Sequence, residues 1–580
     1  MRKGGIKLHG LASGIFHEKV GSSKPEKIYD TYFSWHTEAR LDQSSFFVFY
    51  LFVFLILLIF LVRLFDLSIV LGGENRDLSE NNRIRLVAIE DERGKIFDRN
   101  GQLLAFSKRI YFLKKNNEEH EINLEQVADL EREGLAGENF EGELGKIFQK
   151  VVRKYPLGKA ASHVLGYTSI VQGEDIKEEG RSFQDSVGRL GIEASYDNFL
   201  KGKAGKNLIE VDADSRKIAI LDNVDPISGR NIHLTVDADL QKVAYETLLA
   251  HANRAGSKKG AVIAQSPKTG EILALVSVPA FDGEDIGRYV AEKDQPFFNR
   301  VTLGTYPPGS IFKLISALAG LESGKITANT EIEDVGEFDI SGTRFSNWYY
   351  TQYGRREGIL KIVEAIARSN DIFFYRVGQR IGLEAIRSMA QKLGFGQKTG
   401  IDLPQEAFGL VPDEVWKKSM YGQDWFLGDT MHLAIGQGFM LTTPVQINSM
   451  ISFVASGQRT VPFIVRRIEK GDAGDEINMQ GKILADEVNK DNLRLVRSGM
   501  RQACQTGGTG WPFFDAPYSV VCKTGTAEKS LGNPHAWFSV YAPPDDPQIA
   551  MTVLVEEGGE GSSVAGPVAR EIFDWYFKNR

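Results

Sequence analysis

Ser310 and Lys313 stand three residues apart and have the chemistry of an acylating nucleophile with an amine base beside it. Residues 306–309 (Tyr-Pro-Pro-Gly) favour an extended loop, because prolines disfavour a helix before this point. Apolar residues then recur at helical spacing and predict a mostly buried helix over residues 311–324. We therefore expect Ser310 in the first turn, where free backbone N–H groups favour developing negative charge. This pair is the first motif, and its Ser-x-x-Lys pattern occurs once in the chain.

A second polar cluster, Ser369-Asn370-Asp371, is the second motif and lies between two segments with helical apolar spacing. These segments cover residues 360–367 and 372–377. One interpretation assigns catalysis to the polar side chains, and the other makes Ser369 or Asp371 an ordinary helix N-cap. The residues alone leave both interpretations open.

The third motif, Lys523-Thr524-Gly525, ends an apolar strand and is followed by Thr526. A lysine and two hydroxyls, with a glycine that permits close approach, suit an extended substrate that bears a carboxylate. Residues 268–270 repeat the tripeptide, but they lie in a predicted hairpin turn and lack the Thr-Ala that follows the third motif. The tripeptide alone is therefore weak evidence.

The elements that must position these motifs form an α+β domain over residues 232–580. A short strand at residues 232–236 leads into a helix at residues 237–250. Apolar runs bounded by turn residues predict five further strands: residues 261–265, 272–278, 518–526, 536–542 and 549–555. We expect a five-stranded antiparallel sheet built from both ends of this domain. The largely helical residues 310–455 and a final helix over residues 567–577 should pack against the sheet.

Residues 46–62 form an unbroken apolar run of 17 residues, near the minimum for a membrane-spanning helix, and apolar residues beyond Arg63 extend it. A buried core helix and a cleaved signal sequence are the alternatives. The run is hydrophobic all round, follows a 45-residue leader and has no small-residue cleavage site after it, so we expect a retained anchor. The flanking Lys and Arg residues leave its orientation open.

Residues between the anchor and residue 231 show no nucleophile or cofactor loop of their own. Residues 82–101 have strand and turn patterns, and Asn100-Gly101 is a hairpin signal. Residues 117–155 are rich in charge, with apolar residues at helical spacing, and predict small solvated helices. We interpret this part as a spacer or interaction domain.

The composition argues against several other functions. The net charge of −7 and the lack of a basic stripe with interleaved aromatics disfavour nucleic-acid binding. The nine histidines share no ligand spacing with cysteines, so we expect no metal and no cofactor. Cys504 and Cys522 form one disulfide or none, and they leave the redox compartment open.

Taken in order and at their long separations, the three motifs resemble the signature of penicillin-recognising serine enzymes. Further stretches resemble the class B penicillin-binding proteins, the monofunctional peptidoglycan transpeptidases: residues 306–310, 425–430, 434–438, 535–538, 93–94, 98–101, 163–167 and 191–193, with Glu556. The resemblance spans roughly residues 75–580 and is strongest to the elongation type. It implies a transmembrane helix (46–65), a mixed pedestal domain (73–231) and a penicillin-binding/β-lactamase-like transpeptidase domain (232–580).

Two departures from the family pattern bear on the site. Most relatives carry Asn where this chain has Asp371, which leaves the role of that side chain open. Some close relatives bind zinc near the second motif through His, Cys and Asp, whereas residues 331–369 here contain neither His nor Cys. We therefore expect no zinc site.

The resemblance implies that Ser310 attacks the carbonyl of the penultimate D-alanine in a stem peptide ending in D-Ala-D-Ala. Lys313 would be the general base, Ser369 would relay the proton to the leaving D-alanine, and Lys523 would keep the electrostatics of the cluster poised. An amine of a neighbouring stem peptide would then attack the acyl-enzyme and give a cross-link. β-Lactams would mimic the donor and leave Ser310 trapped.

The resemblance also assigns substrate binding to the strand around the third motif. The hydroxyls of Thr524 and Thr526 would hold the terminal carboxylate, and Gly525 would permit its close approach. The backbone N–H groups of Ser310 and Thr526 would form the oxyanion hole.

Such substrates lie outside the cytoplasmic membrane, which implies an orientation for the anchor. Residues 1–45 would be a cytoplasmic tail, and the catalytic domain would be extracytoplasmic, or periplasmic. The implied partners are stem peptides as donor and acceptor, β-lactams, a polytopic SEDS-family glycosyltransferase and other cell-wall synthesis membrane proteins. Elongation or division, the acceptor amine, the partner of the tail and the oligomeric state stay open.

Three alternatives compete with this interpretation. A D,D-carboxypeptidase or a membrane-bound β-lactamase would pass the acyl group to water, and the long pedestal argues against a β-lactamase. A β-lactam-sensing receptor would need a cytoplasmic signalling element, for which one helix and a 45-residue tail offer little. A structural protein would chiefly activate a glycosyltransferase partner, but all three motifs are intact, so we expect catalysis.

Overall fold

The computed structural model describes residues 43–580 except residues 90, 117, 134, 136–140, 143, 173–185, 212–216, 341, 472–473, 485–487 and 530. The chain divides into two units, residues 1–82 and 83–580, and each is described by itself. Most of the predicted cytoplasmic tail, residues 1–42, lies outside the described residues.

The first unit contains a long apolar helix. Helix α1 (Gln43–Phe65) continues as a π-helical turn (Asp66–Val70) and is followed by α2 (Gly72–Arg83). The segment Phe46–Val70 has 25 residues and is long and apolar enough to cross a membrane. Its side chains are exposed, whereas those of a core helix would be mostly buried. The segment fits the predicted single-pass anchor and extends past the predicted end at residue 65.

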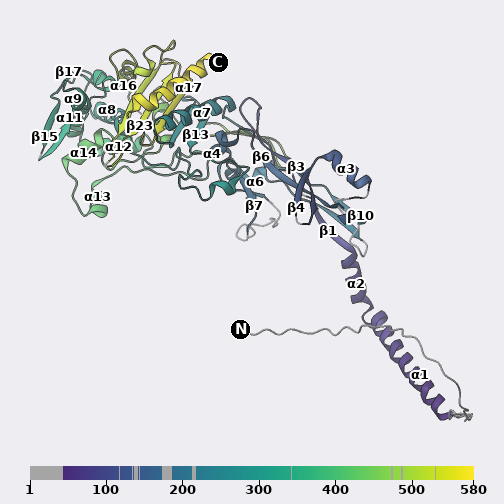
Figure 1. The fold of residues 1–580 in the computed structure, drawn as a ribbon. Helices are drawn as coiled ribbons and strands as arrows, with labels where there is room; N and C mark the ends of the chain where they lie inside the picture. Colours follow the sequence, from purple (N-terminus) through teal and green to yellow (C-terminus); the bar gives the residue numbers. More distant parts are fainter. Residues whose placement is uncertain are drawn as a thin grey trace, which may run out of the picture. The chain divides into compact units, whose positions relative to one another are not determined.

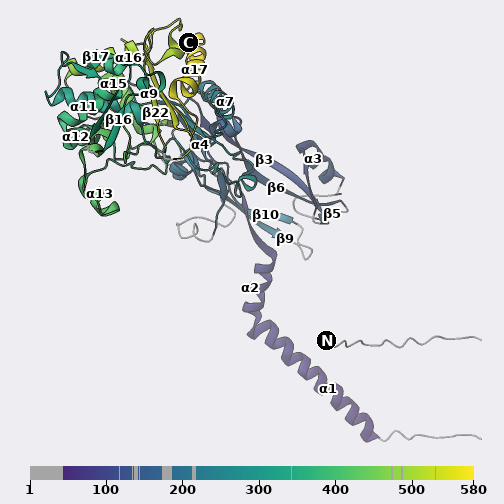
Figure 2. The ribbon, with the colours of Figure 1, turned by 60° about the vertical axis from the view of Figure 1, so that its left-hand side comes forward.

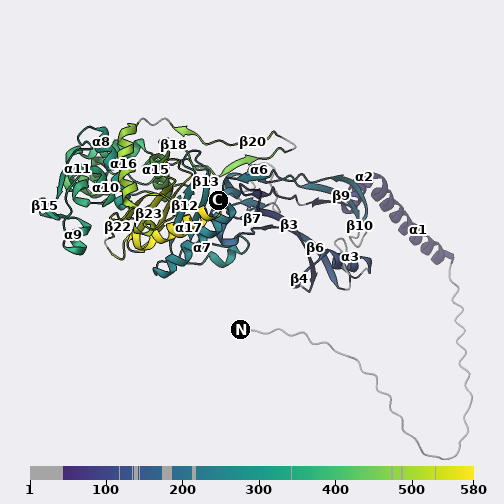
Figure 3. The same cartoon turned by 90° about the horizontal axis from the view of Figure 1, so that it is seen from above.

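The second unit contains the predicted five-stranded antiparallel sheet, with the strand order β13-β12-β24-β23-β22. Its strands are β12 (Gly260–Gln265), β13 (Ile272–Val278), β22 (Val521–Ala527), β23 (His535–Ala542) and β24 (Ile549–Val555). Figure 3 labels four of these strands, β22, β23, β12 and β13, and β24 lies between β23 and β12. Residues 268–270 lie in the turn between β12 and β13, as predicted. Strand β22 is at the edge, so one side of its backbone has no strand partner within the sheet.

Both faces of this sheet are buried. Along β12, Ala261 and Ile263 belong to one hydrophobic cluster, and Val262 and Ala264 belong to another, because successive side chains point to opposite faces. Helices α7 (Ala238–Arg254) and α17 (Gly566–Lys578) contribute to the second cluster, and Figure 1 shows them side by side next to β23 and β13. Helices α8 (Lys313–Glu322), α15 (Pro444–Ser456) and α16 (Lys490–Ala503) contribute to the first cluster. The sheet is therefore held rigidly between two helical layers.

Residues 310–455 are largely helical, as predicted, and the long helix α16 (Lys490–Ala503) follows before β22. The main helices between β13 and β22 are the 3₁₀ helix η5 (Gly309–Phe312), α8 (Lys313–Glu322), α9 (Trp348–Tyr353), α10 (Ile362–Ala367), α11 (Asp371–Ile381), α12 (Leu383–Lys392), α13 (Glu414–Tyr421), α14 (Leu427–Ala434), α15 (Pro444–Ser456) and α16 (Lys490–Ala503). Short strand pairs lie between them: β14 (Ile332–Asp334) with β17 (Gly358–Leu360), β15 (Glu337–Ile340) with β16 (Thr343–Ser346), and β18 (Arg459–Thr460) with β21 (Ile483–Leu484).

A separate eight-stranded sheet has the order β20-β19-β11-β2-β3-β6-β5, and β4 pairs with β3. Its strands are β2 (Ile96–Phe97), β3 (Leu103–Lys115), β4 (Glu118–Ile122), β5 (Glu141–Gly142), β6 (Gly145–Lys154), β11 (Ile232–Leu234), β19 (Val465–Ile468) and β20 (Ile477–Asn478). Strands β2 and β3 form the hairpin predicted at Asn100-Gly101. The remaining strand groups are β1 (Ile84–Ile89), β9 (Gly205–Val211) and β10 (Lys217–Val224), and the pair β7 (Thr168–Ile170) with β8 (Ser186–Gly188).

The predicted small helices over residues 117–155 are correct only for α3 (Leu124–Arg132). Ile147 and Val151 lie in β6, which pairs with β3 over much of its length, as Figure 2 shows. A separation of four residues places two side chains on one face of a strand as well as on one face of a helix. Pairing between strands decides the outcome here, and local spacing cannot reveal it.

A buried ion cluster joins β6 and the residues before β2 to the short helices α5 (Gly191–Ser195) and α6 (Asp197–Leu200). Glu193 is fully buried and accepts hydrogen bonds from Arg93 Nε at 2.5 Å and from Arg153 Nε at 2.7 Å. Arg93 NH2 also lies 2.6 Å from Asp197 Oδ1. Burial raises the pKa of Glu193, but the charges of the two arginines outweigh this and lower the pKa below its usual value.

We predict that Arg93→Ala lowers the stability of the folded chain by about 3–5 kcal/mol, because it leaves buried carboxylates without their cation. Since the pKa of Glu193 is depressed on folding, this stabilisation is present at neutral pH and is lost as the pH falls. The melting temperature at neutral pH measures the loss. Arg99→Ala is the control, since Arg99 pairs with Glu271 at 3.5 Å in a less buried place. Equal melting temperatures for the two variants would contradict the prediction.

Candidate active site

The first motif lies at the junction of two kinds of helix. Ser310 is in the 3₁₀ helix η5, and Lys313 is the first residue of α8. The turn at Ser310 is therefore a 3₁₀ turn, which is tighter than the first turn of an α-helix that the sequence predicts. The two residues are one turn apart. Ser310 is partly exposed, and among the described residues its hydroxyl makes no hydrogen bond. A nucleophile in this position is open to a substrate.

Contacts from several elements fix the loop before Ser310. Tyr306 exchanges backbone hydrogen bonds with Thr442, both at 2.9 Å, and Trp537 Nε1 donates to the Pro307 carbonyl at 3.0 Å. Gly309 has a φ of +54°, and a Cβ there would lie 2.5 Å from the carbonyl oxygen of Thr526. Only glycine permits this approach, which places the nucleophile loop directly against strand β22.

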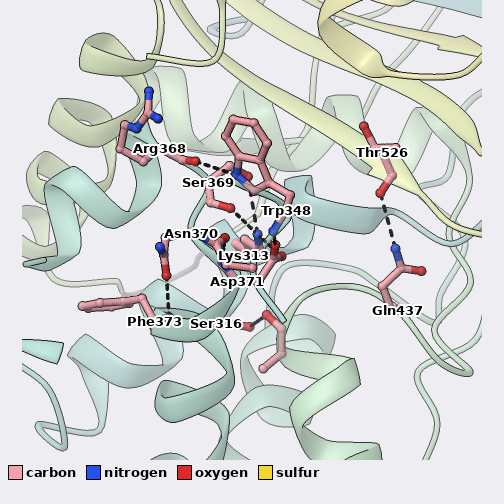
Figure 4. A network of polar contacts seen from close by, with 12 residues as sticks. Lys313, Ser316, Trp348, Arg368, Ser369, Asn370, Asp371, Phe373, Gln437 and Thr526 are labelled. Carbon is pink, nitrogen blue, oxygen red and sulfur yellow. Dashed lines mark hydrogen bonds and ion pairs between the residues drawn. The ribbon is translucent and has the colours of Figure 1, made fainter. Parts of the chain in front are cut away.

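Lys313 is fully buried, and its amine donates to the Ser369 carbonyl oxygen and to Asp371 Oδ1, each at 2.7 Å (Figure 4). A third and longer contact runs from the same amine to the Ser369 hydroxyl at 3.4 Å. Burial lowers the pKa of Lys313, although the charges of Asp371 and Glu357 act in the opposite direction. The amine is therefore suited to accept a proton from a nearby hydroxyl.

Ser369 joins the two lysines of the site. Its hydroxyl accepts hydrogen bonds from Lys523 Nζ at 2.7 Å and from Lys313 Nζ at 3.4 Å. Its φ of +54° lies in the left-handed region, which costs a non-glycine residue on the order of 1–3 kcal/mol. Such a conformation persists only where the surrounding structure imposes it.

The N-cap interpretation of the second motif is wrong for both Ser369 and Asp371. The N-cap of α11 is Asn370, whose side chain accepts a hydrogen bond from Phe373 N at 2.8 Å. Asp371 is the first residue of the helix, and its Oδ2 accepts from Trp348 N at 3.0 Å while Oδ1 binds Lys313. Because Asn370 caps the helix, the side chains of Ser369 and Asp371 are available to contact the buried lysines.

The third motif lies in the edge strand β22, which ends at Ala527, so the motif is close to the end of a strand as predicted. Lys523 is fully buried, and besides Ser369 its amine contacts the Thr524 carbonyl at 2.9 Å. Burial lowers the pKa of Lys523 well below its usual value, and the charge of Lys313 lowers it further. Lys523 therefore loses its proton more readily than an exposed lysine does.

The two threonines predicted to bind substrate have partners that the sequence did not indicate. Thr524 Oγ1 donates to Thr509 Oγ1 at 2.9 Å, and the Thr526 carbonyl accepts from Gln437 Nε2 at 3.3 Å. The N–H and C=O of a strand residue point to the same side. The contact with Gln437, labelled in Figure 4, therefore shows that the backbone of Thr526 faces the free edge of β22.

The structure brings Lys313, Ser369, Asp371 and Lys523 into one hydrogen-bonded cluster. Sequence reasoning missed Thr509, Gln437 and Asn347, whose side chain accepts from Asp371 N at 3.0 Å. The glycines that flank Thr509 could have indicated a close backbone approach. Gln437 lies in the family-like stretch 434–438, which was not assigned to the site, and Asn347 is a single polar residue with no distinctive spacing.

Cys504 and Cys522, left open by the sequence, form a disulfide. The bond joins the residue after α16 to the residue before Lys523. It therefore ties the third motif to the helical layer.

Two family models match the chain. Residues 260–574 match the model described as Penicillin binding protein transpeptidase domain, and residues 120–234 match the one described as Penicillin-binding Protein dimerisation domain. The first match covers more than half of the chain.

Similar proteins share both sequence and fold. Peptidoglycan D,D-transpeptidase MrdA of Salmonella typhimurium is 34% identical over 463 residues, which cover 73% of this chain and 72% of the relative. The structure of the penicillin-binding protein PBP2 of Helicobacter pylori in complex with MreC matches with a TM-score of 0.72 at 28% identity, over 85% of this chain and 99% of that one. A chain from a structure on the coordination of polymerization and crosslinking by a peptidoglycan synthase complex matches with a TM-score of 0.74 at 26% identity, over 93% and 99%.

We predict that Ser369→Gly melts at a higher temperature than Ser369→Ala. Both variants lose the hydroxyl that binds the lysines, but only glycine adopts a positive φ without strain. The difference should correspond to about 1 kcal/mol, measured by thermal unfolding of the two purified proteins. An alanine variant that melts as high as the glycine variant would contradict strain at this residue.

Proposed function

The chain belongs to the class B penicillin-binding proteins, and from this membership we infer that it is a peptidoglycan D,D-transpeptidase whose nucleophile is Ser310. The observation that supports the assignment most strongly is the hydrogen-bonded cluster of Lys313, Ser369 and Lys523 beside the nucleophile loop. A serine-type acyltransferase needs an amine base with a lowered pKa at this place, and burial supplies it. The enzyme cross-links stem peptides in cell-wall synthesis, and we propose that this serves elongation.

In the proposed acylation, Ser310 Oγ attacks the carbonyl of the penultimate D-alanine and Lys313 Nζ accepts its proton. The oxyanion of the tetrahedral intermediate is held by the backbone N–H groups of Ser310 and Thr526. The orientation of the Thr526 backbone toward the free edge of β22 supports this role. Removal of one such donor costs roughly 10²–10³ in rate.

Collapse of the intermediate breaks the bond to the terminal D-alanine, whose nitrogen takes a proton through the Ser369 hydroxyl. Lys523 donates to that hydroxyl and completes the path between the two lysines. The amine of a second stem peptide then attacks the ester, its proton returns through Lys313, and Ser310 is regenerated as the cross-link forms. A β-lactam acylates the same hydroxyl but leaves no departing group, so the ester persists.

The substrate lies along β22 in the proposed complex. Thr524 and Thr526 hydroxyls hold the terminal carboxylate, and Gly525 lets the peptide approach the strand. To bind the carboxylate, the Thr524 hydroxyl turns its proton away from Thr509 Oγ1, to which it donates at 2.9 Å, and Thr509 can then donate to Thr524 in return.

We propose that residues 1–45 are cytoplasmic, that the apolar helix crosses the cytoplasmic membrane, and that the pedestal (73–231) and the transpeptidase domain (232–580) lie outside it. The chemistry supports this orientation, because stem peptides are used outside the membrane. The PBP2 of Helicobacter pylori was solved with MreC, and another similar chain belongs to a peptidoglycan synthase complex. By analogy, we propose a SEDS-family glycosyltransferase and other cell-wall synthesis membrane proteins as partners.

We predict that Ser310→Ala lowers the rate of covalent labelling by a fluorescent penicillin roughly 10³-fold or more. The rate at which stem peptides are cross-linked should fall by the same factor. Both are measured on the full-length protein in detergent. Ser323→Ala is the matched control, because Ser323 is an exposed serine at the other end of α8. Labelling that survives in the Ser310 variant would show that another group is the nucleophile.

We predict that Asp371→Asn moves the acid limb of the acylation rate to lower pH. The charge of Asp371 raises the pKa of Lys313, so its removal lets that pKa fall and keeps the amine unprotonated at lower pH. Rates of penicillin acylation from about pH 5 to about pH 9 measure the limb.

The control for this experiment is Asp239→Asn, which removes an exposed carboxylate in the first turn of α7. This variant should keep the wild-type limb. A limb in Asp371→Asn that stays in place or moves to higher pH would rule out Lys313 as the base.

A further inference from the structure

A buried group of polar side chains lies behind the second motif and is used by none of the proposed steps. We call it the Asp334 network, and it consists of Asp334, Asn347, Glu357, Arg368 and Asn370. Its residues come from β14, from the residue before α9, from the residue before β17 and from the connection between α10 and α11. Figure 4 shows Arg368 and Asn370 beside the catalytic cluster.

Asp334 is the centre of this network and is 2% exposed. Its Oδ2 accepts hydrogen bonds from Asn347 Nδ2, Asn370 Nδ2 and the backbone N of Glu357, each at 3.0 Å. Its Oδ1 accepts from Gly336 N at 2.8 Å. A carboxylate with four donors needs no metal or counter-ion to be buried stably.

Glu357 extends the network toward the third motif. Its Oε2 accepts from Asn370 Nδ2 at 2.8 Å, and its Oε1 forms a short ion pair with Arg368. The same guanidinium donates to the carbonyl of Gly507, in the loop that carries Thr509. One connected set of contacts therefore runs from β14 to the loop that holds the substrate-binding strand.

The network contacts each residue of the second motif or its backbone neighbours. Asn347, held by Asp334, accepts from the backbone N of Asp371 at 3.0 Å. Asn370, fully buried, is held by Asp334 and Glu357 on one side and caps α11 on the other. The strained Ser369 lies between Arg368 and Asn370, so its backbone is fixed on both sides.

We propose that Asp334 and Glu357 are positioning residues for the transpeptidase, which hold the second motif in the geometry that its contacts with the two lysines require. Neither carboxylate touches the reacting atoms. The proposal rests on the proposed roles of Lys313 and Ser369, because it explains how their contacts are maintained.

A purely structural role would not require two buried carboxylates at these positions. Asn370 alone suffices to cap α11, and apolar residues at the other positions would avoid the cost of burying charge. Glu357 also acts on the reaction electrostatically, because its charge raises the pKa of Lys313 across the network. The two carboxylates therefore affect both the position and the protonation of the base.

The test is Glu357→Gln in the full-length protein, a nearly isosteric change that removes the charge and one acceptor. We expect the rate of acylation by a fluorescent penicillin to fall roughly tenfold or more on the plateau of the pH profile, because the second motif is displaced. We also expect the acid limb to move to lower pH, because the pKa of Lys313 loses a contribution that raises it.

Glu333→Gln is the matched control, since Glu333 is the exposed neighbour of Asp334 on β14. It should keep the wild-type rate and limb. A Glu357→Gln protein with a rate within about twofold of wild type and an unmoved limb overturns the proposal. A lower melting temperature with both quantities unchanged also overturns it, since that result marks a structural role only.

Asp334→Asn is the second variant and decides the matter where Glu357→Gln does not fold. The neutral amide weakens the hydrogen bonds from Asn347, Asn370 and Glu357 N and cannot accept from Gly336 N, so the plateau rate should fall. The limb should stay in place, because Asp334 is not among the charges that shift the pKa of Lys313. A wild-type plateau rate in this variant overturns the proposal. Ser310→Ala measured in the same series separates the two hypotheses, since labelling of that variant refutes the proposed function and not only this inference.

Discussion

Two lysine amines buried beside one serine hydroxyl are the constraint on which the rest of the site depends. Lys313 and Lys523 are both fully buried. Two ammonium ions that are removed from water and close to each other would cost much free energy. Lys313 has a carboxylate partner in Asp371, whereas burial and the charge of Lys313 lower the pKa of Lys523 well below its usual value, which favours its uncharged form. The shared hydroxyl of Ser369 then connects one amine to the other, which is the arrangement that a proton relay needs.

This arrangement requires elements far apart in the chain to be held at fixed distances. The first motif spans η5 and the start of α8, the second lies at the junction of α10 and α11, and the third lies in β22. Strand β22 is at the sheet edge because β24, and not β22, pairs with β12 from the other end of the domain. Helices bury both faces of that sheet, so β22 cannot move without disturbing a packed core. The disulfide before Lys523 adds a covalent tie to the helical layer.

The sequence predicts elements whose pattern is local. It does not predict elements whose structure depends on a partner that is distant in the chain. Strands β13 and β24 have the predicted bounds, because continuous apolar runs between turn residues leave little choice for a doubly buried strand. Residues 145–154 form a strand because β3 pairs with them, which local spacing does not reveal. The motif residues were found by their order along the chain. Asp334 and Glu357 were missed, because single carboxylates are common and only the fold brings them to the second motif.

An aspartate at the third position of the second motif changes the demands on the proposed base. Its charge favours the protonated form of Lys313, which opposes proton uptake from the nucleophile, while burial favours the neutral form. A pKa of Lys313 between these two limits suits a two-step acyl transfer better than a very low or a very high one. A base that is too weak would not activate Ser310, and one that is too strong would not return the proton when the acyl group leaves. Because Asp371 engages Lys313 with one oxygen and Trp348 N with the other, its position, and with it this balance, is set by the helix start that Asn347 and Asn370 hold.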